Sequence, residues 1–200
     1  MMKKIIVFDL GGVLVVDGVY PMQSHLAKKF SLNYSKVKKF TINGFKQMFE
    51  GRYSELSFWK KFDKEFSVKT NPKILEKRLN NYYKINVQTK NLIKKLRKNG
   101  YKTGFLSNSV REIVQYLEKK YKISKLFDFG IYSHNVKTRK PKAKIFKLLL
   151  KKIGAKPDEI IFIDDNAGYL KGARKLGIKT VKFVSTIQVS KKLKRLGVSV

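Results

Sequence analysis

Acidic and polar side chains follow three strand-like runs of the sequence, at the point where each run ends. The runs cover 5–8, 103–106 and 160–163, and the residues after them are Asp9, the pair Ser107 and Asn108, and the pair Asp164 and Asp165. The first and third runs are fully apolar, which is typical of strands buried in a parallel sheet. Because ligands bind beyond the carboxyl ends of such strands, we expect these side chains to meet at one edge of the sheet.

Clustered carboxylates of this kind indicate a particular chemistry. They repel one another and resist joint ionisation unless a cation neutralises them. Oxygen ligands suit Mg²⁺, which keeps several waters and also binds phosphate oxygens. Phosphoryl transfer requires charge neutralisation and in-line positioning, and a carboxylate nucleophile divides it into two steps through an acyl phosphate. The pattern therefore indicates magnesium-dependent phosphoryl transfer.

The elements that must position these residues alternate between strands and amphipathic helices. Strands are expected at 5–8, 103–106, 129–132, 160–163 and 180–184, and helices at 88–99, 110–120, 142–153, 167–176 and 187–196. Gly100, Gly154 and Gly177 directly follow three of these helices, as C-terminal cap residues do. The alternation predicts an α/β fold, a Rossmann-like three-layer core around a parallel sheet.

The stretch 18–86 interrupts this alternation. It contains seven of the 14 Phe residues and the only Trp, and several of the Phe residues are spaced four apart, as on one face of a helix. We expect residues 1–17 and 87–200 to form the hydrolase-like core and 18–86 to form a small inserted helical cap. The aromatic side chains are expected to be the interior of this cap rather than contacts to a substrate.

The formal net charge of +32 is unusually high for a chain of 200 residues. A strongly basic surface favours nucleic acid or other anions as partners. Only seven of the 46 basic residues are Arg, however, and the Lys residues are spread along the whole chain. Since bidentate recognition of phosphates and bases favours Arg, we interpret the Lys residues mainly as solvated faces, with nucleic acid a less favoured partner.

The lack of Cys residues and of long apolar runs indicates the cellular compartment. The sequence has no Cys, which excludes disulfides, thiolate metal sites and cysteine nucleophiles. The apolar run 5–8 is too short for a secretory signal because Asp9 interrupts it, and no other run approaches the ~20 residues that cross a bilayer. We expect a soluble cytoplasmic protein without membrane contact, either a monomer or a weak dimer.

Four segments in order carry a resemblance to a known family. They are Phe8-Asp9-Leu10-Gly11-Gly12-Val13-Leu14-Val15, Phe105-Leu106-Ser107-Asn108-Ser109, Arg139-Lys140-Pro141 and Phe162-Ile163-Asp164-Asp165-Asn166. They resemble the four motifs of the haloacid dehalogenase-like hydrolase superfamily. The insertion after the first motif, with the turn at 49–54, is similar to the helical-cap subclass. The closest resemblance is to sugar-phosphatase-like members whose first motif also reads Asp-Leu-Gly.

The resemblance implies a magnesium site. Asp9 would be both the nucleophile and a metal ligand, and Gly11 would offer its backbone carbonyl to the metal. Asp164 and Asp165 would complete the set of ligands.

The same resemblance implies a site for the phosphoryl group. The Ser107 side chain and the backbone amide of Asn108 would bind phosphoryl oxygens. Lys140 would neutralise charge between the nucleophile and the phosphate. The catalytic residues would then be Asp9 and Lys140.

Two positions depart from the family pattern. Phosphatases of this superfamily usually carry a second Asp, the general acid and base, where this chain has Gly11. The candidates to replace it are Asp17, His25 and Glu50. Where an Asn or Asp commonly orients the metal-site waters or the Lys, this chain has Tyr169, and Asn166 is the candidate substitute.

Taken together, these features predict a magnesium-dependent phosphatase that hydrolyses small phosphorylated metabolites, with sugar phosphates the first expectation, through an aspartyl phosphate. A dehalogenase-type hydrolase is one alternative, because those relatives also lack the second Asp, although they generally lack the acidic pair. A catalytically degenerate relative that binds RNA or other polyanions is another. A nucleotide or polynucleotide-end phosphatase would combine catalysis with the basic charge.

Overall fold

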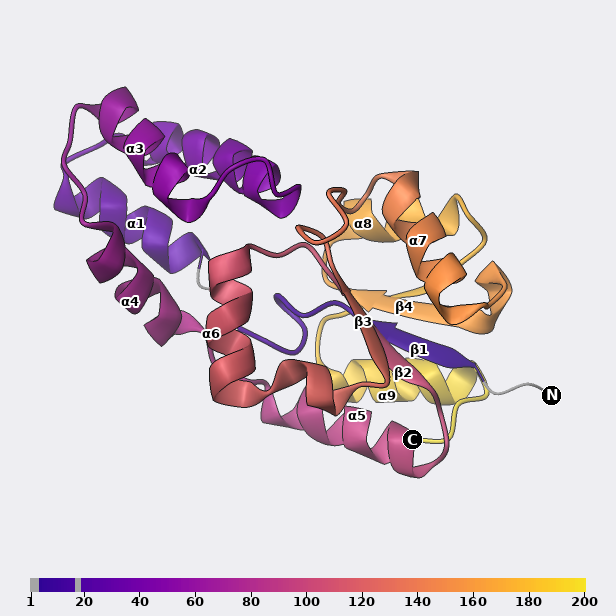
Figure 1. Cartoon of the computed structure of the whole chain (residues 1–200). Helices are drawn as coiled ribbons and strands as arrows, with labels where there is room; N and C mark the ends of the chain where they lie inside the picture. Colours follow the sequence, from indigo (N-terminus) through magenta and orange to yellow (C-terminus); the bar gives the residue numbers. More distant parts are fainter. Residues whose placement is uncertain (1–3, 17–18) are drawn as a thin grey trace.

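The computed structural model describes residues 4–16 and 19–200. Its centre is a parallel sheet of five strands in the order β3-β2-β1-β4-β5 (Figure 1). The strands are β1 (Ile5–Phe8), β2 (Thr103–Ser107), β3 (Phe129–Tyr132), β4 (Ile160–Asp164) and β5 (Lys179–Lys182). The prediction for β5, 180–184, extends two residues too far, and Val184 is largely exposed beyond the strand.

Helices cover both faces of this sheet. The core helices are α5 (Val87–Lys98), α6 (Arg111–Tyr121), α7 (Ala143–Ile153), α8 (Ala167–Arg174) and α9 (Thr186–Arg195), with short 3₁₀ helices at Ile123–Leu126 and Pro157–Glu159. Because successive strand residues point to opposite faces, Val7 packs with residues of α7 and α8 while Ile6 and Phe8 pack with residues of α5 and α9. The three-layer, Rossmann-like α/β fold predicted from the sequence is confirmed.

The register of the central strands determines where the residues that follow them lie. Phe8, the last residue of β1, stands opposite Phe105 of β2 and Ile163 of β4. The next residues of these three parallel strands therefore arrive at the same edge of the sheet. Asp9 lies between the ends of β2 and β4, as expected where strand order places ligands in α/β folds.

Between β1 and α5 the described part of the chain forms four further helices, which we call the inserted helices. They are α1 (Val19–Lys29), α2 (Tyr34–Phe49), α3 (Glu55–Phe66) and α4 (Pro72–Tyr82). Asn33, Ser54 and Asn71 each accept a hydrogen bond from a backbone amide in the first turn of the helix they precede. These polar caps explain why the helices begin where they do.

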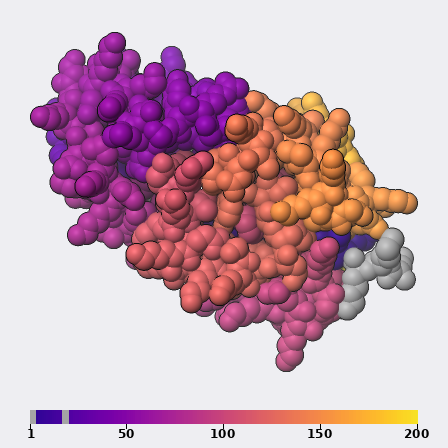
Figure 2. Space-filling view, viewed as in Figure 1, coloured from indigo at the N-terminus to yellow at the C-terminus, as the bar shows by residue number. Residues whose placement is uncertain are grey.

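Aromatic rings form the interior of the inserted helices. Phe58 is fully buried in α3, and its ring lies within 6 Å of the rings of Phe40, Phe45 and Trp59. The spacing of Phe residues in the sequence therefore reflects packing inside this segment. The inserted helices lie over one end of the core, beside α6 (Figures 1 and 2). In the described part of the chain, no helix combines the length and the apolar character needed to cross a membrane.

Candidate active site

Three carboxylates converge at the carboxyl edge of the sheet. Asp9 follows β1, Asp164 ends β4, and Asp165 comes directly after it. One carboxylate oxygen from each lies within 4.8 Å of the other two. Asp9 is 6% exposed and Asp164 is 0% exposed, whereas Asp165 is exposed. This is the grouping that the strand-end residues predicted.

Lys140 is the cation that faces these carboxylates. Its side chain is 0% exposed, and its Nζ lies 2.8 Å from Asp9 Oδ1 and 2.7 Å from Asp164 Oδ2. The Asn108 side chain fixes the backbone of Lys140, because it accepts from the Lys140 amide at 2.9 Å and donates to the Lys140 carbonyl at 3.1 Å. Residues from three distant parts of the sequence thus form one connected network.

Burial dominates the electrostatics of this network. Desolvation, followed by the Asp164 charge, raises the pKa of Asp9 well above its ordinary value, although Lys140 acts in the opposite direction. Desolvation alone would lower the pKa of Lys140, but Asp164 and Asp9 outweigh it and the pKa is raised. The charged form of Lys140 is therefore favoured, whereas burial disfavours the charged form of Asp9.

The site opens into a cleft between the core and the inserted helices. Its volume is about 400 Å³, and core residues that include Asp9, Asn108 and Asp165 face Phe45 and Phe49 of α2 across it. The boundary between the inserted helices (purple) and the core (coral to orange) crosses the face of the molecule seen in Figure 2.

Ser107, the other residue predicted to bind phosphate, ends β2 and is buried. Its hydroxyl lies 3.4 Å from the carbonyl oxygen of Asn108. The structure thus brings the predicted nucleophile, cation and phosphate-binding residues to one edge of the sheet.

The donor set fits a hard divalent cation. Three clustered carboxylates supply oxygen ligands, and additional positive charge would offset the burial of Asp9 beside Asp164. Gly12 has a φ of +74°, and a Cβ there would lie 2.3 Å from Asp165 Oδ2. Only a glycine lets the loop after β1 approach this carboxylate so closely. This role of Gly12 was not predicted from the sequence, in which the pair Gly11 and Gly12 shortly after Asp9 is the available signal.

Glu50, one of the three candidate general acids, is held in a different role. It is 5% exposed, and its carboxylate forms ion pairs with Arg52 at 3.0 Å, with Arg139 at 3.2 Å and with Lys142. Burial would raise the pKa of Glu50, but these cations together lower it. The group is therefore ionised at neutral pH and ties the end of α2 to the loop that carries Lys140.

The structure describes one of the other two candidates, His25. His25 lies on α1 and is not among the residues that line the cleft; burial, together with Arg78 and Lys29, lowers its pKa. Asp17 lies outside the described residues.

Tyr169, the departure from the family pattern, and Asn166, its candidate substitute, both lie beside the charged network. The Lys140 ammonium lies 5.0 Å from the centre of the Tyr169 ring and 5.3 Å from that of Phe162, so aromatic faces flank it. Asn166 caps α8, accepting from the Gly168 and Tyr169 amides, and its own amide donates to Asp164 Oδ1 at 2.8 Å. It therefore positions Asp164 through its backbone while its side chain is committed to the helix.

A parallel Rossmann-like core with an aspartate after β1, an acidic pair at the end of β4 and a buried lysine between them defines the class of site: a carboxylate cluster at the carboxyl edge of the sheet. The chain belongs to the haloacid dehalogenase-like hydrolase family, whose pattern it matches over residues 3–177.

Curated relatives share part of the chain. It is 32% identical over 90 residues to (S)-2-haloacid dehalogenase 4A of Burkholderia cepacia, covering 45% of this chain and 39% of that protein. It is 28% identical to bifunctional epoxide hydrolase 2 of Sus scrofa, over 98% of this chain and 39% of that protein. It is 29% identical to pyrophosphatase PpaX of Bacillus cereus, over 48% of this chain and 44% of that protein. The chain thus spans less than half the length of these relatives.

Solved structures match over nearly the full length. A mutant of HAD family enzyme BT-2542 of Bacteroides thetaiotaomicron, in complex with magnesium and inorganic phosphate, superposes with a TM-score of 0.76 at 26% identity, over 90% of this chain and 94% of that one. A HAD-like hydrolase of Porphyromonas gingivalis superposes with a TM-score of 0.80 at 22% identity, over 98% and 99%. At that identity the second likeness concerns the fold alone.

Proposed function

We propose that the chain is a magnesium-dependent phosphatase that hydrolyses small phosphorylated metabolites through an aspartyl phosphate on Asp9. The observation that carries the proposal is the convergence of three carboxylates within 4.8 Å of one another around the buried Lys140. The complex of BT-2542 with magnesium and inorganic phosphate supports it, since that protein is 26% identical over most of both chains. The similarity to pyrophosphatase PpaX of Bacillus cereus supports hydrolysis of a bond between phosphorus and oxygen.

The metal would be held by side chains of the acidic cluster. Asp9, Asp164, Asp165 and the backbone carbonyl of Gly11 would hold Mg²⁺, which supplies positive charge to the carboxylates and to the phosphoryl oxygens when bound. The raised pKa of Asp9 in the protein alone fits a site designed for additional positive charge.

The chain's own residues would perform the transfer. The Asp9 carboxylate attacks phosphorus, the bond from phosphorus to the leaving oxygen breaks, and water then hydrolyses the acyl phosphate to release orthophosphate. Lys140, fixed by Asn108, would neutralise charge between Asp9 and the transferring group. Ser107 and the backbone amide of Asn108 would bind the phosphoryl oxygens.

The inserted helices would act as the cap of this site. They form the opposite wall of the cleft through Phe45 and Phe49, and the ion pairs of Glu50 hold them to the core beside Lys140. A cap in this position would exclude water from the reacting group and contact the leaving group. We retain 18–86 as its proposed extent.

The test is phosphate release from a panel of phosphorylated metabolites, with Mg²⁺ and with a chelator. Turnover should require the metal, and Asp9→Asn should lower kcat by about 10³-fold or more because the nucleophile is lost. Asp158→Asn, at an exposed Asp far from the site, is the matched control and should retain activity. Equal turnover by wild type and Asp9→Asn would exclude this mechanism.

A dehalogenase is the second candidate, because the chain is similar to a haloacid dehalogenase and has Gly11 in place of a second Asp. A halide ion departs without a proton, so this reaction needs no general acid. Halide release from 2-chloro acids that persists in chelator would select this activity. Salt-dependent retention on RNA with no turnover of either substrate class would instead select the polyanion-binding alternative.

A further inference from the structure

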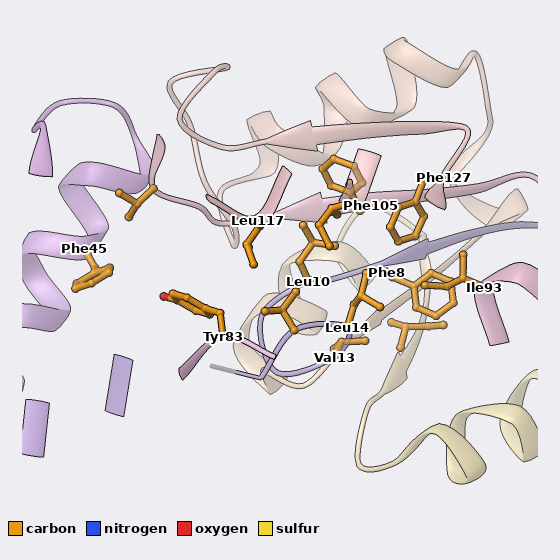
Figure 3. Close-up of a cluster of buried hydrophobic side chains, with 14 of the residues drawn as sticks. Phe8, Leu10, Val13, Leu14, Phe45, Tyr83, Ile93, Phe105, Leu117 and Phe127 are labelled. Carbon is orange, nitrogen blue, oxygen red and sulfur yellow. The ribbon is translucent and has the colours of Figure 1, made fainter. Parts of the chain in front are cut away.

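A small chamber adjoins the cleft on the side of α6. Its volume is about 100 Å³, and its walls come from the loop after β1, from α2, from α6 and from the end of the inserted segment. Leu10, Phe45, Tyr83 and Leu117 are among its lining residues, and Figure 3 shows them arranged around this space. The chamber therefore exists only because the inserted helices meet the core here.

The chamber is continuous with the proposed site. Gly11, Asn108, Phe45 and Phe49 line both the chamber and the cleft that holds Asp9. A Cβ placed on Gly11 would have no atom within 4 Å, so the missing side chain leaves open space at the junction. Ser107, proposed to bind phosphoryl oxygens, also lines the chamber. A group bonded to a phosphate at Asp9 thus has the chamber beside it.

The lining of the chamber is predominantly apolar. Its polar side chains are hydroxyls and one amide, and no carboxylate, imidazole or ammonium group lines it in the described part of the chain. Apolar side chains outnumber the polar ones in this lining, and each hydroxyl buried without a hydrogen-bond partner costs about 1–3 kcal/mol, so an apolar group suits the chamber better than a polyhydroxylated one. The volume of the chamber is about two-thirds of the ~150 Å³ of an engineered apolar cavity that holds benzene, so it has room for a short acyl chain or for most of an aromatic ring.

We propose that this chamber receives the leaving group of the substrate, and that the substrate is a phosphorylated small apolar compound whose leaving oxygen is a weak base, such as a short acyl phosphate or an aryl phosphate. This inference rests on the proposed phosphatase activity and narrows its substrate class. It also gives Gly11 a role, because a larger side chain there would project into the junction between chamber and cleft.

The lack of a described proton donor for the leaving oxygen agrees with a substrate whose leaving group is a weak base. Asp9 forms a bond to phosphorus, and the leaving oxygen keeps the electron pair of the bond that breaks. Position 11 is glycine, Glu50 is committed to ion pairs, and no carboxyl or imidazole lines the chamber in the described part of the chain, so no described residue there is placed to protonate that oxygen. We therefore expect it to depart as an anion. Carboxylates and phenolates depart without a proton far more readily than alkoxides do. Water then releases orthophosphate from Asp9, and no other reactant is needed.

The experiment compares acetyl, butyryl and phenyl phosphate with glucose 1-phosphate, in Mg²⁺, with Asp9→Asn as the blank for spontaneous hydrolysis. Each methylene buried in an apolar site is worth about fourfold in kcat/KM, so butyryl phosphate should exceed acetyl phosphate by about 15-fold. Butyryl and phenyl phosphate should both exceed glucose 1-phosphate by at least about tenfold, and the faster of the two identifies the preferred leaving group.

Val114→Phe tests the chamber itself. Val114 lies on α6, is half-buried and lines the chamber, so a phenyl ring there should occupy its space and remove the advantage of butyryl over acetyl phosphate. Val184→Phe, the same substitution at an exposed residue, should leave this ratio at the wild-type value. Circular dichroism of both variants establishes that they fold.

The outcomes separate the two proposals. A preference for glucose 1-phosphate, or a ratio of butyryl to acetyl phosphate that Val114→Phe leaves intact, would overturn the chamber proposal while leaving a phosphatase. Failure of wild type to release phosphate from any ester or anhydride above the Asp9→Asn blank would overturn the proposed function, and the chamber proposal with it.

Discussion

The edge of the parallel sheet and the inserted helices hold their functional side chains in different ways. At the sheet edge, buried charges are fixed by backbone register and by hydrogen bonds, as Lys140 is by Asn108. In the inserted helices, aromatic rings such as Phe58 pack against one another and leave Phe45 facing the core. The comparison teaches that the reacting groups depend on matched charges, whereas the wall that contacts the leaving group depends on apolar packing.

The largest expected effect on stability is at the charged edge. Lys140→Met keeps most of the side-chain volume but leaves Asp9 and Asp164 buried without their ammonium partner. Removing one partner of a buried ion pair typically costs 3–5 kcal/mol, and we expect a loss of about 4 kcal/mol in the free energy of unfolding. Urea denaturation measures it, and Mg²⁺ should restore part of the loss.

The matched control for this variant is Lys144→Met, at an exposed residue at the start of α7. Its free energy of unfolding should lie within about 0.5 kcal/mol of wild type. If both variants unfold at the same urea concentration, the carboxylates do not depend on Lys140 and the contrast with the inserted helices disappears.

A somewhat smaller effect is expected inside the inserted helices. Phe58→Ala removes a fully buried ring, at a cost of about 3 kcal/mol, near the low end for such truncations because neighbouring rings can close in. Hydrogen exchange should show faster exchange in α2 and α3 while β1 and β4 keep their protection. Leu56→Ala, at an exposed position of the same helix, should change neither. Equal loss of protection in the sheet would mean that the two regions unfold as one unit.

The core could be predicted from the sequence because its signals are local. The run at 5–8 coincides with β1, and the acidic pair ends the predicted strand at 160–163, now β4 (Ile160–Asp164). Parallel strands bring the residues after them to one edge, so the meeting of Asp9 with Asp164 followed from pattern alone.

The features that could not be predicted from the sequence depend on contacts between distant segments. Glu50 appeared as a candidate acid because the sequence does not reveal that Arg139 and Lys142 lie beside it. The approach of Gly12 to Asp165 is likewise a contact across the sheet edge. The chamber needs α2 and α6 to meet, and the relative placement of two helices is not encoded in the periodicity of either.

The smallest expected effect lies at the boundary between the two regions. Glu55 begins α3, accepts a hydrogen bond from Trp59 at 3.0 Å, and its backbone amide lies 3.5 Å from a carboxylate oxygen of Glu112 in α6. Burial, and then repulsion from Glu112 and Glu76, raise the pKa of Glu55 to about 7 against the opposing Trp59 hydrogen bond. A carboxylate of the inserted helices thus faces one of the core in a chain that is otherwise strongly basic.

The sign of the pH dependence follows from this raised pKa. Between the ordinary pKa of 4.5 and about 7, the folded chain keeps a proton on Glu55 that the unfolded chain has lost, so stability falls as pH rises through this window. Glu55→Gln keeps an acceptor for Trp59 but cannot ionise, and it should gain on the order of 1–2 kcal/mol over wild type between pH 5 and pH 8. Thermal unfolding across this range measures the gain, with Glu65→Gln, an exposed residue of the same helix, as the control that should track wild type. A stability difference between Glu55→Gln and wild type that is the same at all pH values would show that Glu55 does not change its protonation state in this range. The contribution of charge to stability would then be confined to the sheet edge and absent from this boundary.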